Sequence, residues 1–389
     1  MWIRARFDIG WSDIWSAALT CAMPLNRELE ATATEQAWDE RGQAIATLSV
    51  RSAFDLALRA LDLPRGSEVL LTALTIPDMI RVVKEHGLCP VPVDVNQSGM
   101  VDLASLEAAI TDRSRVLVVA HLFGGRCDMD QVLGVTRRHK LIVIEDCAQC
   151  FTHIGDKGHP GSDFTMHSFG PIKTATAMGG GMIHVACKET RDRMRQILTF
   201  DPVQLRRGFF IRTSKIAALK VLTGFYASAA MTRILRWLRK DVDEVLNSLG
   251  RGFSRKQLLT QIRHKPSAPL LRLMRRRWST YDFARIERRT ALGRRMDQLL
   301  SQRRETEHSY WVYPVFSTFA KQLALHLRSA GFDATSLSRM TVVPATRSQR
   351  AENVERLWKD VLFLPWYAEL TGDAIAEMGD IIQSYSDGE

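Results

Sequence analysis

Between residues 44 and 146 the chain alternates short apolar runs with stretches whose apolar residues recur at helical spacing. The apolar runs predict strands at 68–73, 90–94, 115–121 and 141–144, and the stretches near them predict helices at 53–63, 80–86, 103–110 and 129–140. Strands that are joined through helices need crossover connections, which produce a mainly parallel sheet with helices on its faces. The sequence therefore predicts an α/β fold.

One lysine and one aspartate stand out at the end of this pattern. Asp146 ends the last apolar run, and Lys173 follows in the small-residue segment 167–173 (HSFGPIK), just before three glycines at 179–181. In a parallel sheet, functional groups collect at the carboxyl ends of the strands. Pyridoxal phosphate (PLP) needs a lysine amine, a carboxylate against its ring nitrogen and donors for its phosphate. Lys173, Asp146 and Ser168 can supply these groups, so the sequence predicts a PLP site.

The positive charge of the chain is concentrated in one segment. Residues 203–310 hold 25 Lys and Arg against 8 Asp and Glu, although the net charge of the whole chain is only +10. Such a segment is either a solvated helical face or the site of an anionic partner. Residues 209–240 mix aromatic and aliphatic side chains with Arg and Lys and contain no acid, which is typical of a helix at an anionic membrane surface. Nucleic acid is a weaker candidate, because no known reader motif occurs.

The cysteines and histidines predict neither disulfides nor a metal site. Six scattered cysteines and the absence of a secretory signal favour free thiols in a cytoplasmic protein. Peripheral attachment of this cytoplasmic protein to the inner face of the membrane is a further possibility that the sequence leaves open. Cys147 and Cys150 have C-x-x-C spacing, but no second Cys or His pair completes a zinc site. We expect His121, His153 and His167 to be structural.

Changes in composition divide the chain into four segments. These are an N-terminal helical segment at 1–40, a large α/β domain at 41–200, a basic helical insertion at 201–304 and a small α+β domain at 305–389. In the last segment the pattern predicts strands at 311–315 and 361–365 and helices at 319–330 and 371–384.

Several short blocks resemble the DegT/DnrJ/StrS family of fold-type-I PLP enzymes, the nucleotide-sugar aminotransferases. In chain order the blocks are 49–58 (SVRSAFDLAL), 64–72 (PRGSEVLLT), 89–94 (CPVPVD), 121–124 (HLFG), 145–149 (EDCAQ), 168–173 (SFGPIK), 364–367 (LPWY) and 370–371 (LT). The resemblance is good over 45–190, fair over 305–389 and poor between them. It implies a large α/β domain, a small C-terminal domain and a homodimer whose sites are completed across the interface.

The resemblance assigns roles to the residues around the ring of the cofactor. Lys173 would bind the cofactor aldehyde and then carry protons between substrate and cofactor. Asp146 would keep the ring nitrogen protonated, so that the ring acts as an electron sink. Gln149 would lie near the ring face or the phenolic oxygen.

The resemblance also assigns a phosphate site, where the chain departs from the family pattern. Ser168 would donate to the phosphate, with Arg51 and Ser52 near it at the start of a helix, which is a natural phosphate site. The usual glycine and threonine of this site are Val50 and Arg51 here, and an arginine can pair a phosphate bidentately. At the usual place of a ring-stacking aromatic residue, Ile76 offers only apolar contact.

The activity implied by the resemblance is amino transfer, because related proteins with histidine in place of the lysine dehydrate instead. A donor, which we expect to be glutamate, would give its amino group to the cofactor, and a keto or aldehyde acceptor would then receive it. The family acceptor is a nucleotide-linked keto-sugar for surface glycans or natural products. The family's G-Y-N-Y-R block is missing, with 263–267 (RHKPS) as its nearest counterpart. This favours two alternatives, a lipid-linked or membrane-associated acceptor and a non-catalytic membrane- or partner-binding protein.

Overall fold

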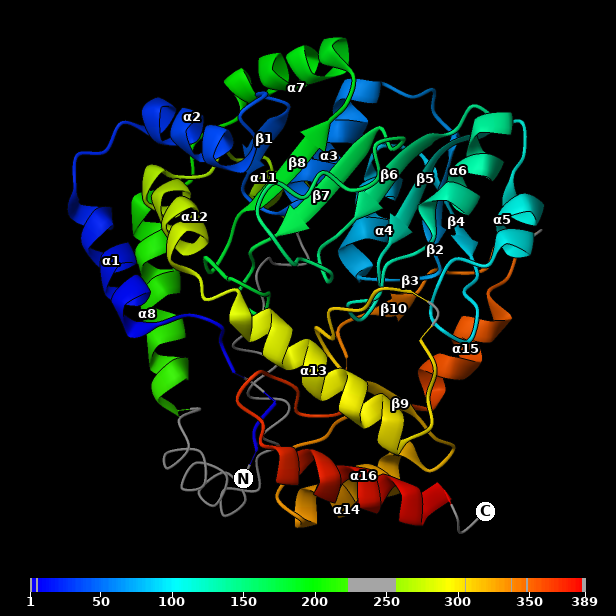
Figure 1. The fold of residues 1–389 in the computed structure, drawn as a ribbon. Helices are drawn as coiled ribbons and strands as arrows, with labels where there is room; N and C mark the ends of the chain where they lie inside the picture. The colour runs from blue at the N-terminus through cyan, green and yellow to red at the C-terminus, as the bar shows by residue number, and fades with distance from the viewer. Residues whose placement is uncertain are drawn as a thin grey trace.

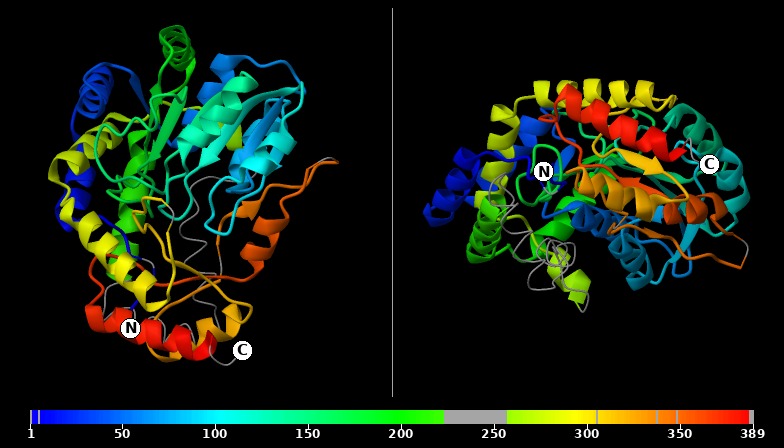
Figure 2. Two further views of the ribbon diagram at one scale, coloured as in Figure 1. Left: turned by 45° about the vertical axis from the view of Figure 1, so that its right-hand side comes forward. Right: turned by 90° about the horizontal axis from the view of Figure 1, so that it is seen from below.

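The computed structural model describes residues 2–4, 6–222, 257–304, 306–336, 338–347 and 349–386. Its centre is a seven-stranded sheet covered by helices, below which lies a smaller layer of helices and short strands (Figure 1). Both chain termini lie beside this smaller layer, as the view from below shows (Figure 2). The predicted α/β fold is confirmed.

The sheet is parallel over five of its seven strands. Its spatial order is β1-β8-β7-β6-β5-β2-β4, and only the β7–β8 and β8–β1 pairs are antiparallel. The strands are β1 (Ala44–Thr47), β2 (Glu68–Thr72), β4 (Cys89–Val93), β5 (Ser114–Ala120), β6 (Ile142–Asp146), β7 (Phe164–Ser168) and β8 (Gly181–Val185). The parallel strands β5 and β6 have Ala120 opposite Asp146, so their carboxyl ends meet at one edge.

Helices cover both faces of the sheet because the strand residues alternate between two cores. One core contains Val69 and Leu71 of β2 and the other contains Leu70. The first core is covered by α3 (Val50–Leu61), α4 (Pro77–Glu85), α7 (Lys188–Phe200) and α11 (Leu258–Ile262). On the other face lie α5 (Leu103–Ala109) and α6 (Met129–Arg138).

Four helices pack over the β1–β8 end of that second face. They are α1 (Trp11–Ala22), α2 (Arg27–Trp38), α8 (Arg206–Leu222) and α12 (Ala268–Thr280). Phe209 of α8 and Leu270, Met274 and Trp278 of α12 share a core with Ala46 of β1. The described helices of the basic segment therefore bury apolar side chains against the sheet domain, and the four-segment division stays a prediction.

The smaller layer has its own apolar core. It is built from β9 (Pro314–Phe316) and β11 (Val361–Phe363), which pair antiparallel, with α13 (Ala284–Leu299), α14 (Ala320–Ser329) and α16 (Gly372–Ser386). The predicted strand at 311–315 begins late, at Pro314, and ends at Phe316. The two-residue strands β3 (Leu74–Thr75) and β10 (Thr341–Val342), with α15 (Glu352–Lys359), connect this layer to the large sheet.

The predicted membrane-surface segment 209–240 is only partly covered by the described residues. Residues 209–222 belong to α8, whereas 223–240 lie outside the described residues. None of the helices in the described part of the chain is both long and apolar enough to span a bilayer.

Candidate active site

Lys173 lies in the turn that leaves the carboxyl end of β7. Its backbone N–H donates to Gly170 O at 3.0 Å, and its Nζ lies 3.9 Å from the centre of the Trp311 ring. Burial lowers the pKa of the Lys173 amine to about 8, with a smaller opposing effect from the Asp146 carboxylate and a further lowering by Arg51. A lysine with this pKa has a much larger neutral, nucleophilic fraction near neutral pH than an exposed lysine has.

Asp146 ends the neighbouring strand β6 and is partly buried. Its Oδ1 accepts a hydrogen bond from the Ala148 N–H at 3.0 Å. Burial raises the pKa of the Asp146 carboxyl, and the nearby Lys173 amine opposes that rise. The fold thus places the predicted lysine and aspartate close enough to influence each other's pKa at the carboxyl edge of the sheet.

The predicted phosphate-binding residues meet across Gly181. This glycine pairs with Ser168 on one side and with Thr47 on the other. A Cβ at Gly181 would lie 3.0 Å from Val50 N, so β8 approaches the start of α3 too closely for a side chain. Ser168 and the amino end of α3 are therefore held side by side, which is the arrangement that an anion site at a helix N-terminus requires.

The residues at the amino end of α3 already have partners within the protein. The Ser49 hydroxyl caps the helix by accepting from the Ser52 N–H at 3.2 Å, and the two hydroxyl oxygens are 3.0 Å apart. Arg51 Nε lies 2.7 Å from Asp78 Oδ2 in the first turn of α4. The guanidinium is thus oriented by a carboxylate while remaining close enough to Lys173 to lower the pKa of its amine.

Two of the predicted residues, Gln149 and Ile76, have contacts that serve the fold. The Gln149 side-chain carbonyl accepts from the Phe123 N–H at 2.8 Å and so ties the loop after β6 to the loop after β5. Ile76 precedes α4 and packs against the first apolar core. The structure brings together Lys173, Asp146, Arg51 and, at the α3 terminus, Ser52 with Ser168.

The loop after Lys173 is held by residues that are distant in the sequence. The Asp8 carboxylate accepts from the Ala175 N–H at 2.9 Å, and Arg277 Nε donates to Thr176 O at 3.0 Å. Ala175 has a left-handed backbone (φ 51°), which is costly for a residue with a side chain. These contacts compensate for that cost and fix the loop.

A further contact comes from α13, where the buried Arg289 donates through Nη1 to Thr174 Oγ1 at 3.1 Å. Sequence reasoning missed Asp8, Arg277, Arg289 and Trp311. They lie outside the recognisable blocks, and no local pattern marks them.

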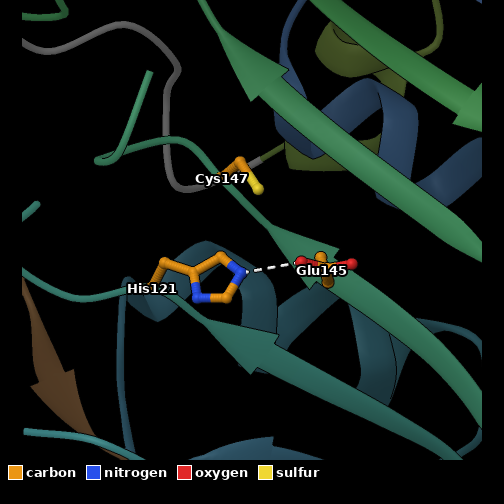
Figure 3. A group of neighbouring side chains, drawn as sticks. All are labelled: His121, Glu145 and Cys147. Atoms are coloured by element: carbon orange, nitrogen blue, oxygen red, sulfur yellow. Dashed lines mark hydrogen bonds and ion pairs between the residues drawn. The ribbon is translucent and has the colours of Figure 1, made fainter. Parts of the chain in front are cut away.

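Three buried residues near the site have the composition of a metal centre. The ligand atoms of His121, Glu145 and Cys147 lie within 4.8 Å of one another (Figure 3). His121 Nδ1 accepts from the Cys127 N–H at 3.1 Å, so the ring proton lies on Nε2, which donates to Glu145 at 2.9 Å. A metal on Nε2 would displace that proton to Nδ1, against the Cys127 N–H. The geometry favours a hydrogen-bonded pair that joins the ends of β5 and β6.

A cavity of about 600 Å³ lies beside Lys173. Its walls come from the N-terminal segment, α8, α12, α13 and the smaller layer, and they are rich in aromatic and cationic side chains. Tyr281, Arg285, Trp311, Tyr367 and Glu369 are among them. The cavity has the size of a small-molecule site. It is closed by segments from four parts of the sequence, which explains why no single motif predicts it.

Comparison with known families agrees with this geometry. The family model described as the DegT/DnrJ/EryC1/StrS aminotransferase family matches residues 17–219.

The chain belongs to this family. The resemblance inferred from the blocks at 49–58, 145–149 and 168–173 is thereby confirmed, since all three lie inside the matched range.

Curated DegT/DnrJ/EryC1/StrS relatives match a limited part of the chain. GDP-perosamine synthase of Caulobacter vibrioides is 38% identical over 155 residues, which are 39% of this chain and 42% of that protein. The spore coat polysaccharide biosynthesis protein SpsC of Bacillus subtilis is 34% identical over 155 residues, or 39% of this chain and 40% of that protein. The chain thus matches about two fifths of the length of these relatives.

Solved structures of aminotransferases match over nearly the full chain. The sugar aminotransferase CalS13 from Micromonospora echinospora has a TM-score of 0.73 at 19% identity and covers 99% of this chain and 100% of its own. The aminotransferase PseC from Helicobacter pylori has a TM-score of 0.70 at 15% identity, with 100% of both chains covered. The fold is therefore that of fold-type-I aminotransferases, including the small C-terminal layer.

Proposed function

We propose that this protein is a PLP-dependent aminotransferase. The observation that carries the proposal is the partly buried Lys173 amine, whose pKa is lowered to about 8 and which lies close enough to Asp146 at the carboxyl edge of the parallel sheet to interact with it electrostatically. A neutral amine beside a carboxylate is the pair that PLP requires, and family membership supports the same chemistry.

The donor set fits the cofactor at both of its ends. Asp146 would hold the ring nitrogen, and Lys173 would bind the aldehyde carbon. The phosphate would lie between Ser168 and the amino end of α3, beside the backbone N–H groups of its first turn, the Ser52 hydroxyl and the Arg51 guanidinium. When bound, PLP supplies the electron sink that stabilises negative charge on the substrate carbon.

The remaining assignments concern the surroundings of the ring. Ile76 would offer apolar contact to one face, and Gln149 would lie near the ring face or the phenolic oxygen. Lys173 would move the proton between substrate carbon and cofactor, for which its lowered pKa is suited. Trp311, whose ring contacts the Lys173 amine, would hold that amine on the cavity side.

We further propose glutamate as the amino donor and a nucleotide-linked keto-sugar as the acceptor. The printed names of the relatives, GDP-perosamine synthase and a spore coat polysaccharide biosynthesis protein, support a sugar acceptor and a role in surface glycan synthesis. A lipid-linked acceptor is the second candidate. The observation that favours it is the exposed apolar face of α1 and α8 beside the cavity, described below.

The proposed partners and location follow from the same reasoning. A homodimer would complete the site across its interface, and the basic segment 209–240 would allow attachment to an anionic membrane at the cytoplasmic face. The third hypothesis, a non-catalytic binding protein, remains the reference against which the activity is tested.

The experiment is the visible absorbance spectrum of the purified protein, recorded before and after excess glutamate. We expect a yellow absorbance that glutamate bleaches, that is lost in Lys173→Ala and that persists in the control Lys84→Ala, an exposed lysine on α4. A colourless wild-type protein that PLP cannot reconstitute would overturn the proposal. A yellow protein that no amino acid bleaches would overturn the transferase activity alone.

A further inference from the structure

Helix α1 exposes large aromatic and aliphatic side chains along one side. On α1, Trp11, Trp15 and Leu19 follow one another at four-residue spacing, and Trp15 and Leu19 are 64% and 68% exposed. Residues at this spacing lie on one side of a helix. The helix buries its other side, through Ile14 and Ala17, so its exposed stripe is not needed for packing.

The neighbouring helix α8 also exposes large apolar side chains. The two helices pack side by side at one edge of the molecule (Figure 1). Phe210, Ile211 and Val221 of α8 are exposed, whereas Phe209 is buried in the core. Large apolar side chains that stay exposed on two packed helices are typical of an interaction site. We call the exposed side chains of the two helices the α1–α8 face.

The charge on this face is positive. Helix α8 contains five cations and no acid, and among them Arg207 and Lys215 are exposed. The one acid of α1, Asp13, is buried and bonded to Arg276 and Arg277, so it does not offset these charges at the surface. Tryptophan combined with basic side chains is the composition that binds the interface of anionic membranes.

A second copy of the chain is a poorer occupant for the same face. In a symmetric pair each copy presents the same patch, so the cations of one α8 would meet those of the other. Like charges facing each other oppose association. An anionic lipid surface complements both the apolar stripe and the charge.

The α1–α8 face also borders the cavity that contains Lys173. Trp11 and Lys220 both line that cavity, and the Lys220 Nζ lies 6.0 Å from the centre of the Trp11 ring. Burial lowers the pKa of the Lys220 amine, in keeping with its place in the wall of the cavity. A surface that covers the α1–α8 face therefore lies next to the mouth of the candidate active site.

We propose that the α1–α8 face docks on an anionic lipid surface and holds the mouth of the cavity at the lipid headgroups. The acceptor then reaches the site from the membrane, which favours a substrate carried on a lipid. This last consequence rests on the proposed function. The docking itself does not depend on it.

The test is flotation of the full chain, reconstituted with PLP, on vesicles of neutral phosphatidylcholine and on vesicles containing anionic phosphatidylglycerol. We expect flotation with the anionic vesicles only, reduced by added salt. Two double variants probe the two components of the face. Trp15→Ser with Leu19→Ser removes apolar side chains, and Arg207→Gln with Lys215→Gln removes positive charges. Because buried apolar side chains and basic side chains each contribute to binding at an anionic membrane surface, each double variant should weaken binding about tenfold or more.

Matched controls come from α14, which carries an exposed leucine and an exposed lysine far from this face. Leu325→Ser with Lys321→Gln should float like the wild type. Lys173→Ala should also float like the wild type. Flotation therefore tests the docking even if the proposed function is wrong. Thermal melts of all variants check that each is folded.

Three outcomes would overturn the proposal. The first is that the wild type does not float. The second is that Trp15→Ser/Leu19→Ser floats as well as the wild type. The third is that the α14 control loses flotation as much as the variants of the α1–α8 face do.

Sedimentation velocity identifies the competing explanation. If the wild type does not float and Trp15→Ser/Leu19→Ser dissociates an oligomer, the α1–α8 face is a contact between copies of the chain.

Discussion

The carboxyl edge of the sheet and the basic helices that close over it are built in different ways. At the sheet edge, Lys173, Asp146 and Ser168 come from short blocks that adjacent strands bring together. In the basic region, arginines are held by acids far away in the sequence, as with Arg277 and Asp13 or Arg275 and Glu30. The first region can be recognised from local patterns, whereas the second depends on partners that only folding brings near.

Because of this difference, not all of the positive charge in residues 203–310 faces the solvent. Part of it is neutralised inside the molecule, since Arg263 pairs with the buried Asp55 and Arg285 with Asp8 and Glu369. Segment charge counted from the sequence therefore overstates the charge that is available to a partner. On α8, Arg207 and Lys215 remain exposed, which narrows the membrane hypothesis to one face.

The two regions meet at the aromatic core behind the active-site loop. Phe169 belongs to the lysine-bearing block and Trp278 to the basic segment, and their ring centres are 5.2 Å apart. Both rings also contact Trp38 of the N-terminal segment. The basic helices thus form part of the scaffold that supports the candidate site.

The largest expected effect tests the paired character of the basic region. Asp13→Ala removes the carboxylate that accepts from Arg276 at 2.8 Å and from the buried Arg277 at 2.7 Å. An uncompensated buried charge would remain, so we expect a loss of about 3–5 kcal/mol in the free energy of unfolding. Urea denaturation followed by circular dichroism measures it. A loss below about 1 kcal/mol would contradict the paired architecture.

A smaller effect tests whether the N-terminal segment serves the lysine loop. Asp8→Ala removes the acceptor of the Ala175 N–H, at 2.9 Å, and of the Tyr281 hydroxyl, at 2.6 Å. Hydrogen bonds to a charged group contribute about 1.5–3 kcal/mol, so PLP should be retained about tenfold to hundredfold more weakly. Equilibrium dialysis against PLP gives the affinity. Asp192→Ala, on α7 and remote from this loop, is the control and should retain PLP like the wild type.

The pH dependence of PLP capture tests the sheet-edge region. Because only the neutral amine attacks the aldehyde, the capture rate should rise with pH and level off above the Lys173 pKa of about 8. The Asp146 carboxylate raises that pKa, so Asp146→Asn should move the midpoint to lower pH, by on the order of one unit or about 1.4 kcal/mol. Stopped-flow absorbance at a series of pH values records the midpoint. A shift to higher pH would contradict the contact between the two groups.

The smallest effect comes from an exposed ion pair in the basic region. Asp282 and Arg288 are more than half exposed and lie 2.7 Å apart. Exposed pairs contribute about 0–1 kcal/mol, so Asp282→Asn should change the free energy of unfolding by less than 1 kcal/mol. The same urea titration serves as the measurement. A loss of unfolding free energy as large as that of Asp13→Ala would contradict the idea that buried ion pairs stabilise this protein more than exposed ones.

Much of the sheet domain could be predicted from the sequence, because its elements depend on local periodicity. The predicted strand at 68–73 is β2 (Glu68–Thr72), and the predicted helix at 103–110 is α5 (Leu103–Ala109). Strands β7 and β8 were not predicted, since the polar and glycine-rich sequence around them hides their alternation. At the site, the lysine and aspartate were predictable because family blocks mark them.

The sequence by itself determined the α/β class and the family, and it marked Lys173 as the candidate cofactor lysine. Each of these depends on residues that are close together along the chain. Only the tertiary structure decided which residues clamp the lysine loop, which arginines are neutralised and which face of α1 and α8 stays exposed. The physical reason is that pairing, burial and exposure are properties of distance in space, and Asp8, Arg277 and Arg289 reach the lysine loop only after the chain has folded.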